Sequence, residues 1–300
     1  MKLTSAVALG SALLAVSIGS ALAAQQAPGV ESLRVEMAPV LDKLAGDYLG
    51  SVRFTMRNPT NKAVRVLKYQ TPFHGVEADL FSISVAGEGV DYTGRLVKRG
   101  EPAARDYMTL AAGEVRSIDI DLSAYYNFAK SGQYEVRYGN RLHGENGQAK
   151  RVNSTPTVMW VDGNDQFLGS RVDQEPWHGY GVKALNPAPA FTRCTTTQQS
   201  QALTALNSAR AYSTESRSYY GSHTSASITP RYTTWFGAST PTRYTKATTD
   251  YTNIEAALTG QTIGIDCGCK KTYFAYVYPN QPYKIYVCRA FWSAANTGTD

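Results

Sequence analysis

The sequence has few residues of the kinds that build a metal site or a nucleophile. Its 300 residues include only four histidines, which are His74, His143, His178 and His223. No two of them lie four positions apart, the spacing that a zinc-binding His-x-x-x-His helix requires. No serine lies in a Gly-x-Ser-x-Gly turn either. We therefore predict no catalytic residue and no metal ligand in this chain, and we expect each histidine to be an ordinary surface or hydrogen-bonded residue.

Glutamate is also scarce beyond residue 190, where only Glu215 and Glu255 occur. Both fall on helical patterns, where a solvated face is the usual environment. Paired carboxylates for glycoside hydrolysis stay open on this evidence. The only other support for a carbohydrate-active enzyme is the abundance of aromatic residues, so we rank this hypothesis last.

Cysteine is absent from the first 193 residues and occurs four times after them. In an exported chain an even number of cysteines indicates disulfides, and four cysteines allow three pairings. Cys267 and Cys269 are two residues apart, so on a strand they would point to the same side. A Cys-x-Cys metal site is the alternative, but no neighbouring histidine or cysteine completes it.

Long hydrophobic runs are absent after the first two dozen residues. Lys2, an apolar run from about Ala6 to Val16 and the small residues around Ala23 predict a signal peptide over residues 1–23. The run is too short for a transmembrane helix. We expect a secreted, extracellular protein that has no membrane association after the signal is removed.

Strong charge of one sign is missing too. The net charge is +6, and residues 191–300 hold 10 basic against 5 acidic side chains without any basic run. No motif for reading bases is present. The sequence therefore predicts no nucleic-acid partner.

A period of two dominates residues 51–162. Apolar residues alternate with polar ones in four runs, around Phe54, Ile83, Ile120 and Val136, and turn-forming residues separate the runs. This pattern predicts an all-β antiparallel sandwich that follows a lead-in over residues 24–50.

The period changes near the end of the chain. Residues 163–190 are rich in Gly, Pro and Asn and predict a linker, which contains Trp177. In residues 191–300 a capping box at Thr195 or Thr196 opens a helical stripe, a second stripe ends at Gly260, and two strands follow around a turn. Helices followed by a short sheet predict an α+β region.

Four blocks of this last region resemble a known family. They are RYTTWFG (231–237), DCGC (266–269), FAYVYPN (274–280) and VCRAFWSAANTGTD (287–300). In this order they resemble the deuterolysin-like peptidyl-Lys metalloendopeptidases, the aspzincins, and residues 67–81 and 92–100 resemble the prodomain that precedes such peptidases. In that family a helix with HExxH follows the TGTD-like run, and a GTxD segment comes after it. Because the 300 residues contain neither motif, we expect residues 191–300 to be the N-terminal part of an incomplete zincin-like peptidase domain.

The resemblance implies the disulfides Cys194–Cys267 and Cys269–Cys288. It implies zinc in the intact parent, and we expect none to bind this chain and the chain alone to be inactive. In zincin folds an edge strand ahead of the catalytic helix pairs with the peptide substrate. Lys284, Tyr286 and Cys288, in the segment Lys284 to Ala290, are our candidates for that strand. An ordinary strand pinned by Cys288 is the alternative.

The leading hypothesis is a precursor of a secreted zinc metalloendopeptidase that cleaves proteins or peptides on the N-terminal side of lysine. The sandwich would act as prodomain, chaperone and inhibitor of its own peptidase domain. Lys183 is the only lysine between residues 151 and 245, so we expect self-maturation at Val182–Lys183. The alternative function is a non-enzymatic secreted binding protein with a degenerate peptidase-like domain.

Overall fold

The N-terminal part of the chain is built from strands. The computed structural model describes residues 29–40, 50–145, 147–163 and 186–294. One antiparallel sheet has the order β1-β2-β8, and a second contains β10-β9-β4-β5, with β11 also paired to β9. Strands β3 and β7 form a separate pair. The bounds are β1 Arg34–Pro39, β2 Ser51–Arg57, β3 Val64–Leu67, β4 Phe81–Val85, β5 Glu88–Gly89, β6 Leu96–Lys98, β7 Tyr107–Leu110, β8 Val115–Asp121, β9 Gly132–His143, β10 Ala149–Asn153 and β11 Thr157–Val161.

These sheets enclose one apolar core. The largest fully buried side chains of the described residues are aromatic residues of this part, including Phe54, Tyr126 and Tyr138. Phe54 meets the Tyr138 ring edge to face, with 5.0 Å between ring centroids, and the Tyr126 hydroxyl donates to Asp79 at 2.8 Å. The four alternating runs noted in the sequence lie on β2, β4, β8 and β9. The antiparallel sheets agree with the predicted strand content, and the sandwich arrangement itself stays a prediction.

The core begins earlier in the chain than residue 51. Val30 is fully buried in it, and β1 pairs with β2 so that Val35 lies opposite Met56. The predicted lead-in thus supplies both a strand and core residues. The predicted signal peptide and most of the predicted linker lie outside the described residues.

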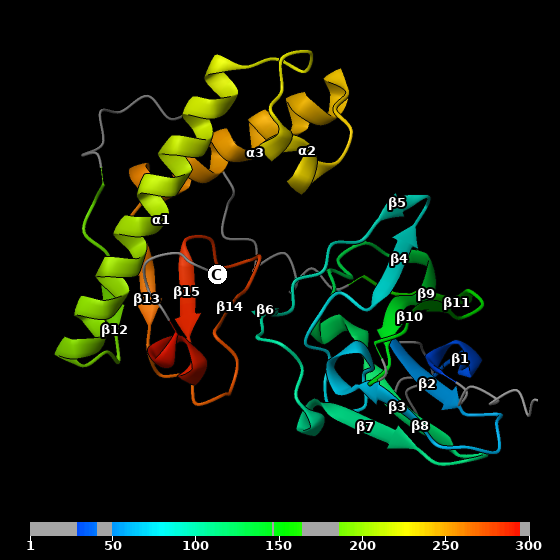
Figure 1. Ribbon diagram of the computed structural model, residues 1–300. Helices are drawn as coiled ribbons and strands as arrows, with labels where there is room; N and C mark the ends of the chain where they lie inside the picture. Colours follow the sequence, from blue (N-terminus) through cyan, green and yellow to red (C-terminus); the bar gives the residue numbers. More distant parts are fainter. Residues whose placement is uncertain (1–28, 41–49, 146, 164–185, 295–300) are drawn as a thin grey trace, which may run out of the picture.

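The C-terminal part has three α-helices and a small mixed sheet among its described residues. The helices are α1 Thr196–Ser222, α2 Pro230–Phe236 and α3 Pro241–Gly260, and the strands are β12 Ala190–Thr192, β13 Gly264–Asp266, β14 Ala275–Val277 and β15 Lys284–Val287. The sheet order is β12-β13-β15-β14-β6. β12, β13 and β15 run parallel, whereas β14 is antiparallel to β15 and to β6. Figure 1 shows the helices on one side of this sheet and β6 beside β14, where the two parts of the chain meet.

Local chemistry explains where the helices start. Thr195 caps α1: its side chain accepts from the Gln198 amide, and the Gln198 side chain accepts from the Thr195 amide, which is the predicted capping box. Helix α3 starts at Pro241, with Thr240 as its cap. Gly260 is the last residue of α3, and the residue after it, Gln261, occupies the C-terminal cap position.

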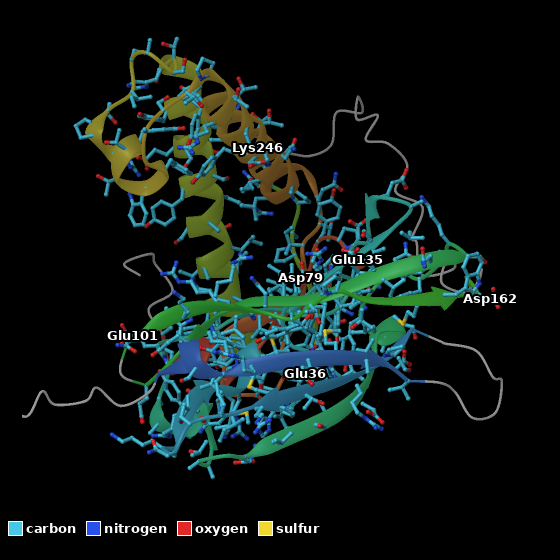
Figure 2. All side chains as sticks on the ribbon, turned by 90° about the vertical axis from the view of Figure 1, so that its right-hand side faces the viewer. Glu36, Asp79, Glu101, Glu135, Asp162 and Lys246 are labelled. Atoms are coloured by element: carbon cyan, nitrogen blue, oxygen red, sulfur yellow. A yellow bond between two sulfur atoms is a disulfide. The ribbon has the colours of Figure 1, made fainter. Side chains whose placement is uncertain are left out.

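Two apolar clusters hold the helices in place. Ala202 and Leu206 of α1 pack with Ile265 and Val287 of the sheet. At the far ends of the helices Tyr220 packs among the rings of α2 and α3. No helix in the described part of the chain is long and apolar enough to cross a membrane. Figure 2 shows the helical layer, with Lys246 on α3, on one side of the molecule and β1 and β9, with Glu36 and Glu135, on the other.

Candidate functional site

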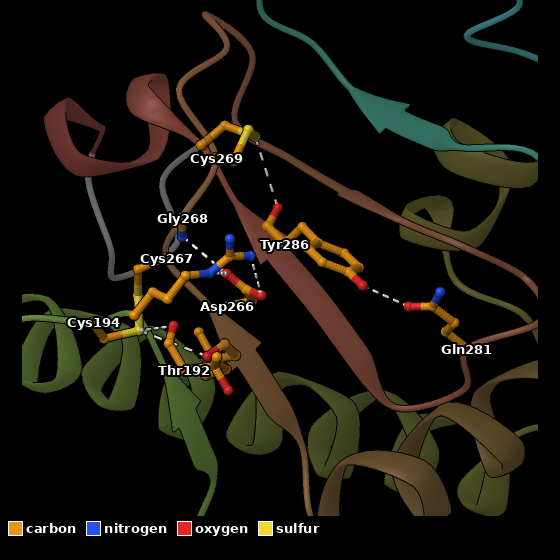
Figure 3. Close-up of polar contacts among 11 residues, drawn as sticks. Thr192, Cys194, Asp266, Cys267, Gly268, Cys269, Gln281 and Tyr286 are labelled. Carbon is orange, nitrogen blue, oxygen red and sulfur yellow. Dashed lines mark hydrogen bonds and ion pairs between the residues drawn. A yellow bond between two sulfur atoms is a disulfide. The ribbon is translucent and has the colours of Figure 1, made fainter.

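The mixed sheet is fastened by both disulfides of the chain. Cys194 is bonded to Cys267, and Cys269 is bonded to Cys288. These are the pairs that the resemblance implies. The first bond joins the start of α1 to the end of β13, and the second joins the loop after β13 to the end of β15, so the pair fixes one end of the sheet (Figure 3).

A buried carboxylate lies beside the first disulfide. The Asp266 side chain is 4% exposed and accepts from Arg193 Nε at 3.0 Å and from Arg193 Nη2 at 2.5 Å. The Gly268 amide also donates to it at 2.9 Å. Burial alone would raise the pKa of Asp266, but the hydrogen bonds from Arg193 and Gly268 outweigh it and hold the pKa below its ordinary value. Asp266 is therefore a charged anchor near neutral pH and cannot serve as a general acid there.

Gly268 lies close to the side chain of Arg193. A Cβ at this position would lie 2.5 Å from the guanidinium carbon of Arg193, so any side chain there would require Arg193 to shift. Arg193 itself has a φ of 57°, a left-handed conformation that costs a non-glycine residue free energy. From this conformation Arg193 makes its bidentate bond to Asp266, and we call these two residues the clasp.

The predicted substrate strand is an inner strand of the sheet. β15 lies between β13 and β14, so its backbone is paired on both sides. Lys284 lies opposite Gly264, and Tyr286 lies opposite both Asp266 and Tyr276. Cys288 follows the strand and is fully buried. The described residues therefore leave no free edge on β15 for a peptide, and the outer position belongs to β14 and β6.

An aromatic pair marks the face of the sheet near this edge. The rings of Tyr276 on β14 and Tyr286 on β15 are parallel, with 4.6 Å between centroids. The Tyr286 hydroxyl donates to Gln281 at 2.6 Å, as Figure 3 shows. Burial, with smaller contributions from neighbouring tyrosines, raises the pKa of Tyr276. Tyr276 is thus a neutral packing group here.

The described histidines lie apart in the fold and have ordinary partners. His143 Nδ1 lies 2.6 Å from Gln70 Nε2 in the N-terminal part. His223 stacks on Tyr219 after α1, with 4.2 Å between centroids. His74 is exposed. Glu215 pairs with Arg231 on the surface at 3.3 Å. His178, Val182 and Lys183 lie outside the described residues.

Zinc needs three protein ligands and an open coordination position. Within the described ranges no three His, Cys, Asp or Glu side chains are grouped so that they hold a metal ion. All four cysteines are in disulfides, and Asp266 is committed to Arg193. The described residues therefore do not fit a zinc centre, and we assign no catalytic step to them.

Comparison with known proteins gives the chemistry that the geometry alone does not. The profile of the lysine-specific metallo-endopeptidases matches residues 220–300. An extracellular protease of Aeromonas hydrophila is 38% identical, with 83% of this chain and 72% of the relative covered. The chain belongs to the aspzincin family. This aspzincin is also 29% identical to a peptidyl-Lys metalloendopeptidase of Grifola frondosa, over 97% of this chain and 83% of that one.

One solved structure, a zinc peptidase from Grifola frondosa, is 39% identical to this aspzincin. The similarity covers 36% of this chain and 64% of that chain, with a TM-score of 0.31. The family and its relatives are metalloendopeptidases.

Sequence reasoning missed the contact between the two parts of the aspzincin chain. Strand β6 comes from a segment that shows little alternation, and β14 lies about 180 residues later. The RLVK run carries two apolar residues between basic ones, which is the only local hint of a strand there. Its partner was not predictable from any period in the sequence.

Proposed function

We propose that the protein is a secreted precursor of a zinc metalloendopeptidase that cleaves peptide bonds on the N-terminal side of lysine. The observation that carries this proposal is the similarity to a peptidyl-Lys metalloendopeptidase over 97% of the chain, which takes in the β-rich part as well as the helical part. The name of the Aeromonas relative, an extracellular protease, supports export, as do two disulfides. The family assignment favours a peptidase over a non-enzymatic binding protein.

In the proposed enzyme zinc would supply the positive charge that activates a water and polarises the scissile carbonyl, and the described residues would not hold it. The contribution of the described residues is mechanical. Two disulfides and the Asp266–Arg193 clasp fix the sheet on which a peptide would be aligned. A sheet fixed at one end holds its strand edge in a constant position, and constant positioning is what orientation of a substrate requires.

The first test measures metal dependence. The secreted gene product should hydrolyse a quenched fluorescent peptide that contains one lysine, lose this activity to a chelator and regain it with zinc. A matched peptide with alanine in place of the lysine is the control. Activity that survives chelation, or equal cleavage of both peptides, would contradict the proposal.

The second test concerns maturation at Val182–Lys183. Amino-terminal sequencing of the mature protein should give Lys183 as the first residue, because no other lysine lies between residues 151 and 245. The Lys183→Ala variant should accumulate as precursor, and the control Lys150→Ala, on β10, should mature normally. A mature terminus far from Lys183 would rule out this route.

The N-terminal β-rich part is proposed to be the prodomain, which assists folding and keeps the peptidase silent. Its support is the shared sheet, since β6 lies within the peptidase-like part. Co-expression of residues 29–163 in trans with the peptidase part should restore a fold that the peptidase part does not reach alone. Normal folding without the β-rich part would remove the chaperone role.

A further inference from the structure

We infer that strand β6 occupies the peptide-binding edge of the peptidase sheet and so acts as an internal stand-in for substrate. β14 is the last strand that the C-terminal part contributes, and β6 from the N-terminal part covers its outer side. The pairing is antiparallel, with Lys98 opposite Ala275, Val97 opposite Tyr276 and Leu96 opposite Val277. A strand edge left open presents unpaired amides and carbonyls, which are the groups that an extended peptide uses for recognition.

The backbone pairing continues past the strand itself. The Phe274 amide donates to the Lys98 carbonyl at 3.1 Å, and Gly100 lies against the Phe274 ring, where a Cβ would be 3.4 Å away. On its other side Phe274 accepts from the Cys288 amide at 2.8 Å. β6 therefore adds to the outer side of a strand whose inner side is already paired with β15.

Two arginines that flank β6 are positioned by one carboxylate of the same N-terminal part and contact Tyr273 of the C-terminal part. Glu77 accepts from Arg99 at 2.6 Å and lies 3.7 Å from Arg95, and its side chain is 17% exposed. Arg95 Nη1 donates to the Tyr273 hydroxyl at 3.3 Å. Arg99 lies over the Tyr273 ring, 5.1 Å from its centroid. Glu77 and Tyr273 thus grip the same two arginines from opposite parts of the chain, and we call these four residues the latch.

The β6 side chains themselves are held weakly. Leu96 is 45% exposed, and Lys98 is exposed as well. A short strand held by main-chain pairing and by a half-buried ion cluster opens more readily than a core strand, because little apolar area is lost. β6 can therefore leave the edge without unfolding the N-terminal core, which an internal stand-in requires.

The chemistry of β6 also suits the proposed specificity, on which this part of the inference rests. Lys98 is the lysine of the strand, it follows two aliphatic residues, and it faces outward opposite Ala275. An extended segment that carries a lysine is what a peptidase directed at lysine would accept. Before another peptide can pair with β14, β6 must be displaced.

The test uses hydrogen exchange on the 300-residue chain, so it needs no hydrolysis. Glu77→Gln removes the charge that holds both arginines. We expect the amides on the β6 side of β14, such as that of Phe274, to exchange about tenfold faster than in the wild type, the factor that corresponds to roughly 1.4 kcal/mol. The control is Glu88→Gln. It removes the exposed carboxylate on β5 that pairs with Lys130 and should change nothing at β14.

A labelled peptide of residues 94–100 then probes the edge directly. It should bind the Glu77→Gln variant at least about tenfold more tightly than the wild type, since only the variant frees β14. The same residues in reversed order are the control. Unchanged exchange at β14 together with equal peptide binding to both proteins would overturn the inference.

A cross-link tests the β6–β14 pairing without the Glu77→Gln change. Leu96 and Val277 lie directly opposite each other, so Leu96→Cys with Val277→Cys should form a disulfide within one chain. Failure of this bond to form, or its formation between two chains, would overturn the inference. If the edge opens as described but the gene product hydrolyses nothing, the proposed function fails and the β6–β14 assignment stands.

Discussion

Removal of the Cys194–Cys267 disulfide is the sharpest test of how this sheet is stabilised. The bond closes a loop of 73 residues that contains all of α1, α2 and α3. The entropy of closing such a loop is worth about 4.4 kcal/mol at room temperature. The Cys269–Cys288 bond closes only 19 residues, and the same relation gives about 3.2 kcal/mol.

The perturbation is therefore a matched pair of double variants, Cys194→Ala/Cys267→Ala and Cys269→Ala/Cys288→Ala. Both remove two sulfur atoms, and the remaining native pair is left intact. We expect the first variant to lose about 1 kcal/mol more than the second, because its loop is longer.

The assay is native-state hydrogen exchange read at α1 and β13, with β9 as an internal reference. Both variants should leave β9 unchanged, since its core contains no disulfide. A reversed order, or a loss below about 1 kcal/mol for the longer loop, would refute the reasoning that loop closure is the main contribution.

Three further predictions concern pH and a buried charge. Asp266→Asn should lower the free energy of unfolding of the C-terminal part by about 1–3 kcal/mol, because a buried bidentate acceptor is lost; Asp119→Asn, at an exposed pair with Arg53, should have little effect, and equal effects in chemical denaturation would contradict the clasp. Because the folded pKa of Asp266 lies below its ordinary 3.8, its contribution is present above about pH 4 and is lost as the pH falls through the folded value. Burial, with smaller contributions from tyrosines led by Tyr251, raises the pKa of Tyr220 from 10.0 to about 12, so the contribution of Tyr220 to stability should fall between pH 10 and 12; an equal fall in the Tyr220→Phe variant would contradict this.

The sequence predicted those elements whose side chains repeat on one buried face. Val52, Phe54 and Met56 alternate because one side of β2 faces the core, and all three are fully buried. The strands on both sides of Pro279 were predictable for a different reason, since turn residues separate two aromatic runs. Such elements depend on local periodicity, which a single sequence records.

Other elements left no such record. Helix α2 has seven residues, too few for a helical period to show, and contains two adjacent threonines that favour strands. Strand β1 has only two inward residues, Val35 and Met37, before Pro39 ends it.

Which strand lies at the edge of the C-terminal sheet was not predictable either. The sequence gives two strands in the FAYVYPN and KIYVC segments but not their order in space. Lys284 and Tyr286 were therefore expected on a substrate-pairing strand, whereas the structure has β15 inside and β14 outside. Strand order depends on contacts between distant segments, here β12, β13 and β6.

The most direct test of the account is a map of the bonds that the mature gene product cleaves in a mixture of denatured proteins, read by mass spectrometry of the new amino termini. The account predicts that most of these termini begin with lysine and that a chelator abolishes them. Termini without lysine enrichment, or no cleavage after the N-terminal part has been removed, would contradict it.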